Sequence, residues 1–125
     1  MNAPTESTQF AIPQLNEGDI YAGAIINPDG TGHHIILLDG DNDDADWQAQ
    51  MDWAKSIGGD LPDRVEQAML FKHLKDRFQP EWYWSNTQHA SYSDCAWYQD
   101  FNNGYQSYGH KSYGVRGRAV RRVAI

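Results

Sequence analysis

The sequence predicts a single α+β domain, and three observations lead to this fold class. Strand-like segments occur near both ends of the chain, and two amphipathic helical segments lie between them. The 125 residues are enough for one hydrophobic core and too few for two. Aromatic residues make up 13% of the chain, so Trp, Tyr and Phe are expected to supply much of that core. We expect one domain over residues 19–125, preceded by a polar arm over residues 1–18.

The first expected element is a β-hairpin over residues 19–38. DIYAGAII and HHIILL have strand character, and NPDG between them favours a tight turn. The next run, DGDNDDAD, has the composition of a calcium-binding loop. Counting from Asp39, however, places Asp44 and Gln50 where an EF-hand loop requires Gly and Glu. We therefore expect a solvated acidic loop in which Asp43 or Asp44 caps a helix, and no metal site.

Two helices are expected next, over residues 45–59 and 61–78. The apolar residues of the first fall on one helical face: Trp47, Met51, Ala54 and Ile57. The second begins with Asp63 and Glu66 at capping-box spacing and stops before Pro80. Because both helices are amphipathic, we expect them to pack on one sheet.

The last third of the chain reads as strands. The segments are residues 82–86, 95–101, 105–109 and a closing strand over 115–125, with a tight turn at NNG. Alternation along the second segment predicts Trp97, Gln99 and Phe101 on one face and Tyr98 and Asp100 on the other. The first and last strands of the chain are expected to be neighbours.

Charge is distributed unevenly along the chain. Residues 1–60 hold eleven acids and one lysine, a sum of −10, whereas residues 61–125 sum to +3. We expect the halves to pair electrostatically, and the overall charge of −7 argues against nucleic-acid binding. No apolar run approaches the roughly 20 residues needed to span a bilayer. The first residues lack a basic start and an apolar stretch, so we expect no secretory signal.

Catalytic and cofactor-binding patterns are missing from the sequence. His33 and His34 are adjacent and would face opposite sides of a strand, so they do not easily share a metal ion. The lone Cys95 has no disulfide partner within the chain. There is no glycine-rich phosphate loop and no nucleophile elbow. We therefore expect no enzyme, no metal and no cofactor, with a site assembled from distant segments as the alternative.

Three motifs in order carry a resemblance to a known family: W..A..WA...GG.LP.R.EQ..L, then WYWS, then AWY..F.NGY.SYG.K.Y..R.RAVR. Together they resemble, over roughly residues 18–123, a bacterial and phage family with the C-type-lectin-like fold. That family includes the C-terminal domain of a collagen-like adhesin. Its distant kin are retroelement-diversified phage tropism determinants and formylglycine-generating enzymes. The resemblance implies two helices on a small irregular antiparallel sheet, with adjacent terminal strands.

The resemblance also bears on activity. The enzymatic branch depends on a cysteine pair, and this chain has only Cys95. Animal lectins of this fold bind sugar through calcium with Glu-Pro-Asn and Trp-Asn-Asp sequences, which are missing here. The resemblance therefore implies neither the enzymatic activity nor calcium-dependent sugar binding.

In the tropism determinants, ligand contacts come from the last third of the chain. The resemblance thus implies a surface within residues 86–113, made of Asn86, His89, Tyr92, Tyr98, Asp100, Asn102, Tyr105, Ser107, Tyr108, His110 and Tyr113. Tyr supplies rigid contact area and Ser and Asn adaptable hydrogen bonds, as in antibody loops. We expect a phage- or prophage-encoded binding module for a protein or cell-surface receptor, located on the virion tail or in the host cytoplasm.

Two alternatives stay open. One is a structural tail or baseplate accessory that docks to other phage tail proteins through residues 1–18. The other is an intracellular inhibitor that engages a host protein through the acidic half. Adhesive relatives are often trimers, so a homo-oligomer is expected by analogy.

Overall fold

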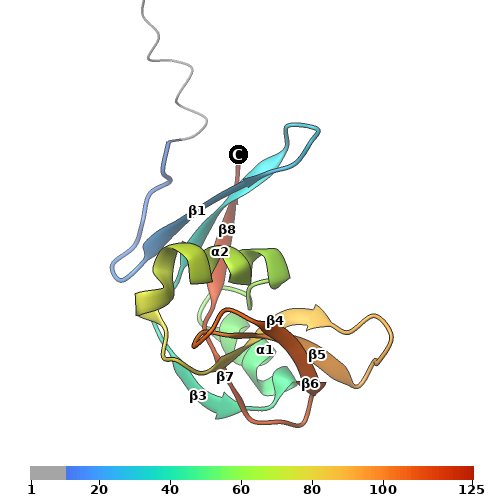
Figure 1. Cartoon of the computed structure of the whole chain (residues 1–125). Helices are drawn as coiled ribbons and strands as arrows, with labels where there is room; N and C mark the ends of the chain where they lie inside the picture. Colours follow the sequence, from blue (N-terminus) through green and yellow to red (C-terminus); the bar gives the residue numbers. More distant parts are fainter. Residues whose placement is uncertain (1–10) are drawn as a thin grey trace, which may run out of the picture.

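The computed structural model describes residues 11–125 and confirms the α+β class (Figure 1). In chain order the elements are β1 (Ile20–Ile26), β2 (Gly32–Leu37), β3 (Asn42–Ala45), α1 (Trp47–Ser56), α2 (Arg64–Leu74), the 3₁₀ turn η2 (Lys75–Arg77), β4 (Trp82–Gln88), β5 (Cys95–Asp100), β6 (Gln106–His110), β7 (Val115–Gly117) and β8 (Val120–Ala124). The first ten residues of the expected arm lie outside the described residues.

One sheet is three-stranded and antiparallel, in the order β1-β2-β8. The expected hairpin forms β1 and β2, and its register shifts between Tyr21 and Gly23. The expectation that the first and last strands are direct neighbours is wrong, because β2 lies between them. β2 takes the central place because Ile35, Ile36 and Leu37 have no exposed surface and need cover on both sides.

The second sheet has the order β3-β7-β4-β5-β6 and is mixed rather than antiparallel, since β4 and β7 run parallel. The acidic segment, expected as a loop, contains the strand β3. It pairs with β7, where the Arg116 guanidinium lies 2.9 Å from Asp41 and 3.3 Å from Asp43. These ion pairs offset the repulsion among the acids that would otherwise disfavour a strand.

The closing segment is two strands rather than one. It leaves the second sheet after β7 and enters the first sheet as β8. Arg118 and Ala119 occupy the crossover, and the buried Arg118 donates to the backbone carbonyls of Arg77 and Leu38. Where the chain passes from one sheet to the other, the buried Arg118 side chain is held by hydrogen bonds to backbone carbonyls.

The start of α2 agrees with the expected cap, whereas the expectation that Asp43 or Asp44 caps the first helix is wrong, because those residues lie in β3 and the cap is Asp46. Asp46 accepts a hydrogen bond from the Ala49 amide at the start of α1, and Asp63 and Glu66 form the expected capping box at the start of α2. The second helix ends at Leu74, earlier than expected, and continues only as the turn η2. Phe78 is extended and stacks on Phe101, with ring centroids 3.9 Å apart.

The two helices do not share one face of a sheet. α1 packs with Trp84, Tyr98 and Val115 in one core cluster, whereas α2 packs with Tyr83 and Phe101 in a second cluster that includes β1 and β2. Adjacent strand residues point to opposite faces, so the five-stranded sheet has a helix on each side. No helix formed by residues 11–125 is long and apolar enough to cross a membrane.

A candidate ligand-binding face

The most concentrated group of partly exposed aromatic rings lies at the junction of α2, β5 and β6. We call it the aromatic face and define it by Arg64, His89, Tyr92, Trp97 and Tyr108. The His89 ring stacks on Trp97 at 5.2 Å and on Tyr92 at 4.9 Å between centroids. Trp97 and Tyr108 are cross-strand partners, and their rings meet edge to face at 5.2 Å. Such pairs hold one another in fixed orientations.

The loop between β4 and β5 fixes the His89 ring. Its Nδ1 accepts hydrogen bonds from the backbone amides of Ser91 at 3.0 Å and Tyr92 at 3.1 Å. The loop is closed by backbone bonds from His89 N to Cys95 O and from Cys95 N to Tyr92 O, both 2.9 Å. Tyr92, with 54% of its surface exposed, is therefore presented on an ordered loop.

Arg64 brings a positive charge to the same face. Its guanidinium carbon lies 3.5 Å from the centre of the Trp97 ring. The Arg64 Nε donates to Gln106 Oε1 at 3.0 Å, and Gln106 Nε2 donates back to the Arg64 carbonyl at 2.7 Å. No carboxylate within residues 11–125 forms an ion pair with Arg64. The guanidinium is thus oriented by a ring and an amide and keeps donors for an outside group.

An open groove of about 560 Å³ adjoins this charge. It runs between α2 and the end of the β5–β6 hairpin, and its lining residues are Arg64, Val65, Ala68, Gln99, Gly104 and Gln106. Val65 is 62% exposed, so the groove presents apolar surface beside the guanidinium.

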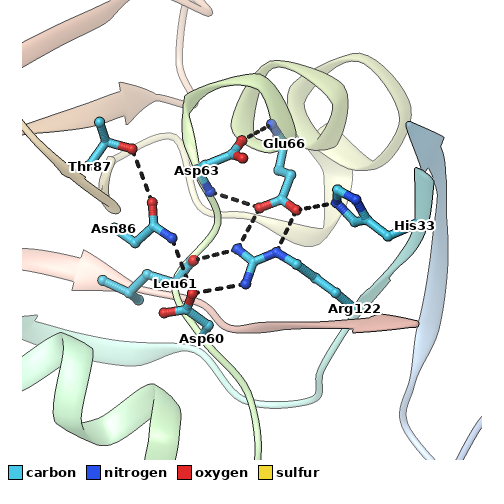
Figure 2. Close-up of polar contacts among 8 residues, drawn as sticks. All are labelled: His33, Asp60, Leu61, Asp63, Glu66, Asn86, Thr87 and Arg122. Atoms are coloured by element: carbon cyan, nitrogen blue, oxygen red, sulfur yellow. Dashed lines mark hydrogen bonds and ion pairs between the residues drawn. The ribbon is translucent and has the colours of Figure 1, made fainter. Parts of the chain in front are cut away.

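Arg64 is the first residue of α2. A polar network around Glu66 positions this first turn of the helix (Figure 2). Glu66 has no exposed surface, and its carboxylate accepts hydrogen bonds from the Asp63 amide, from His33 Nε2 at 2.9 Å and from two nitrogens of Arg122 at 2.7 Å. Burial raises the pKa of Glu66, but the hydrogen bonds from Arg122, Asp63 and His33 outweigh it and leave this pKa below its usual value. The network ties β2 and β8 to the helix.

Asn86, an expected ligand contact, takes part in this network. Its side-chain amide donates to Asp60 at 3.1 Å, and its oxygen accepts from the Thr87 hydroxyl at 3.0 Å (Figure 2). Its backbone amide donates to the Pro62 carbonyl. Asp60 also accepts a hydrogen bond from the Arg122 guanidinium at 2.9 Å. Through Asp60 and Arg122, Asn86 therefore connects β4 to the start of α2.

The other expected site residues are spread over both sides of the sheet. Tyr98 is buried on the α1 side, where it stacks on Trp82 at 4.4 Å, so the expectation that it lies on the surface is wrong. Ser107, its cross-strand partner, and Asp100 are half-buried. Asp100 accepts from the Asn102 amide, and the Tyr113 ring covers Gly109. Asn102 and Tyr105 lie at the hairpin turn, and His110 approaches Asp94 at 3.5 Å.

The structure therefore brings together His89, Tyr92 and Tyr108 from the expected set, and adds Trp97 and Arg64. Trp97 shares the expected face with Phe101, but it is only half-buried, and the Arg64 guanidinium lies over its ring. Arg64 is not among the expected site residues, and its place one residue after the helix cap is the signal that the sequence offers for it.

A second hollow, of about 240 Å³, lies on the Tyr98 side of the sheet and is lined by residues that include Asp44, Glu81, Trp82 and Asp100. Within residues 11–125, no group of three or more His, Cys, Asp or Glu side chains is arranged to hold a metal ion.

Comparison with known proteins gives no match. No family model matches the chain, and neither the curated proteins nor the solved structures contain a match.

Proposed function

We propose that the chain is a non-enzymatic binding module with a C-type-lectin-like fold, encoded by a phage or prophage. It recognises a protein or a cell-surface receptor through the aromatic face. The observation that carries this proposal is the partly exposed stack of His89, Tyr92, Trp97 and Tyr108 with the Arg64 guanidinium over Trp97. The fold and the phage origin are supported by the three sequence motifs alone.

The chemistry of the aromatic face supports binding to a macromolecule. Trp, Tyr and Arg are the residue types that dominate the binding energy of protein interfaces. Here their side chains are held by ring stacking and by hydrogen bonds to the backbone, so little side-chain entropy is lost when a partner binds. The groove beside Val65 adds apolar area next to a cation, which suits a ligand with an apolar side chain and an acidic or carbonyl group.

A matched pair of tyrosine variants tests the proposal. The purified chain is used to select ligands from a random-peptide display library and from a glycan array. Ligands selected with the native chain are then measured against Tyr92→Ala, which removes an exposed ring of the aromatic face, and Tyr105→Ala, which removes an exposed ring at the hairpin turn. We expect Tyr92→Ala to weaken binding by about tenfold or more, and Tyr105→Ala to leave it nearly unchanged.

The reverse order of effects contradicts the proposal, as does failure to select any ligand from both libraries. The tail-accessory and host-inhibitor alternatives stay predictions.

A further inference from the structure

The strand β6 forms one edge of the five-stranded sheet, and among residues 11–125 it pairs only with β5. Two backbone hydrogen bonds at the ends of the β5–β6 pair show which opposed residues bond to each other. They run from Lys111 N to Asp94 O and from Asp100 N to Tyr105 O, both at 2.8 Å. Because this pairing alternates in antiparallel strands, Gln106 and Tyr108 are in the positions that do not bond to β5. The backbone N–H and C=O groups of these two residues therefore point away from the sheet.

These outward groups are free within the part of the chain that the structure describes. No side chain or loop of residues 11–125 forms a hydrogen bond with the backbone N–H or C=O of Gln106 or Tyr108. The neighbouring His110 carbonyl, in contrast, accepts from the Tyr113 amide at 2.9 Å. The open part of the edge is thus the short stretch from Gln106 to Tyr108.

The other three sheet edges carry features that hinder pairing with another chain. β1 is interrupted by the register shift before Gly23, β3 contains Asp43 and Asp44, and β8 carries Arg121 and Arg122. β6 has the sequence QSYGH, with no Asp, Glu, Lys, Arg or Pro, and its register with β5 is continuous. Charges, bulges and proline are the usual devices that keep an edge strand from pairing, so β6 is the unprotected edge.

We propose that β6 pairs with β6 of a second copy of this chain, antiparallel about a two-fold axis at Ser107. In this register the outward N–H and C=O of Gln106 bond to those of Tyr108 in the second copy, and the reverse pair forms by symmetry. The outward backbone groups of Gln106 and Tyr108 are then satisfied in both copies. The two sheets become one continuous sheet with an isologous interface.

The register follows from the His110 carbonyl. An axis at Tyr108 would pair Gln106 with His110 of the second copy, whose carbonyl already accepts from Tyr113. An axis at Ser107 avoids that group. A second copy fits because the same uncharged strand carries both the donors and the acceptors at matching spacing.

The side chains also fit this arrangement. Tyr108 of the second copy would come opposite Gln106, beside the groove that Val65 and Ala68 line. Tyr108 is 41% exposed in the single chain, so it has apolar area left to bury. The aromatic faces of the two copies would then adjoin each other on the same side of the sheet. This inference stands on the β6 backbone and does not rest on what the aromatic face binds.

A cysteine cross-link tests the register directly. The variant Ser107→Cys is made in a Cys95→Ser background, so that each chain carries one thiol. In the proposed dimer the two substituted positions oppose each other without backbone hydrogen bonds between them. The Cα atoms of such pairs lie about 4.5 Å apart, which is within the range of a disulfide. Ser93→Cys, on the exposed β4–β5 loop, is the matched control. Under mild oxidation we expect Ser107→Cys to form a disulfide-linked species of twice the 14.2 kDa protomer mass, and Ser93→Cys to stay monomeric. Absence of the Ser107 cross-link, or equal cross-linking of both variants, overturns the proposal.

Sedimentation velocity gives a second test. Tyr108→Pro removes an N–H that β5 does not use, so an edge strand tolerates it, whereas Tyr108→Val loses the ring but keeps the N–H. We expect the native chain and Tyr108→Val to dimerise, and Tyr108→Pro to do so at least about tenfold more weakly. Circular dichroism checks that both variants fold. If the proline variant does not fold, the Ser107→Cys cross-link is the deciding test. A native chain that is monomeric at its highest soluble concentration overturns the proposal, as does a proline variant that dimerises like the valine variant.

Discussion

Arg122 holds Glu66 by both carboxylate oxygens, with its Nε 2.7 Å from one oxygen and its terminal nitrogen 2.7 Å from the other. This bidentate pair joins the last strand of the chain to the first turn of α2. Glu66 also closes the capping box with Asp63, so one buried carboxylate serves the helix start and the contact between the helix and the three-stranded sheet.

Removing the charge of Glu66 should destabilise the fold strongly. Glu66→Gln keeps the shape of the side chain but removes the fully buried carboxylate that pairs with Arg122, which leaves Asp60 as the counter-charge of the guanidinium. We expect the free energy of unfolding in urea to fall by about 1.5–3 kcal/mol, as for the loss of hydrogen bonds to charged groups. Glu81→Gln, at an exposed acid that forms no ion pair within residues 11–125, should change it by less than about 0.5 kcal/mol. Equal effects would show that Glu66 is not central to the network.

Acid should weaken the fold through the same carboxylate. The folded-state pKa of Glu66 lies below its usual value, so the unfolded chain binds the proton more readily. The stabilisation is complete above the unfolded pKa of about 4.3 and is lost as the pH falls through the folded value. Urea titrations at about pH 6 and about pH 3 should therefore show a smaller loss of stability for Glu66→Gln than for the native chain. A loss of the same size in both would contradict this assignment.

Alkali should show that Tyr83 ionises late. Burial and the hydrogen bond to Asp41 raise the pKa of Tyr83 to about 12. The neutral phenol is favoured in the fold, so its contribution to stability is present below the ordinary tyrosine pKa of about 10 and is lost as the pH rises toward the folded value. In an ultraviolet absorbance titration, Tyr83→Phe should remove a late phase that the native chain shows. A titration curve whose late phase survives the substitution would assign that phase to another tyrosine.

Two glycines offer a matched test of packing at the hairpin turn. Gly104 has a φ of +86°, and a Cβ there would lie 2.8 Å from the Phe71 ring; Gly30 has a φ of +90° with nothing within 4 Å of a Cβ. Gly30→Ala should cost about 1 kcal/mol from the left-handed backbone alone. Gly104→Ala should cost at least about 2 kcal/mol, because the ring must also move. Thermal and urea unfolding compare the two variants. Equal losses of unfolding free energy would show that the Phe71 ring moves aside at no cost.

Local features were predictable from sequence because their causes are local. The capping box depends on Asp63 and Glu66, three residues apart, and the hairpin turn depends on NPDG. The strand β3 was not predictable, because its acidic residues form a strand only against Arg116, more than seventy residues away in the chain.

The aromatic face shows the same limit. Alternation along β5 correctly separates Trp97 from Tyr98, but it does not say which of the two a helix will cover. The placement of α1 against Tyr98 decides this, and it leaves Trp97 to the Arg64 guanidinium. Hence three expected site residues, His89, Tyr92 and Tyr108, meet on one face, while Tyr98 becomes core.

The three-stranded sheet should make the domain resist a pulling force more strongly in one direction than in others. β1 and β8 both run antiparallel to β2, so they are parallel to each other (Figure 1). Ile20 at the start of β1 pairs with Leu37, and Ala124 at the end of β8 pairs with His33, near the opposite end of β2. A force that pulls residues 19 and 125 apart therefore loads both ladders in shear, so that many hydrogen bonds must break together instead of one after another. If the domain is attached at residues 19 and 125, it should resist stretching far better than if the force is applied at the β4–β5 loop.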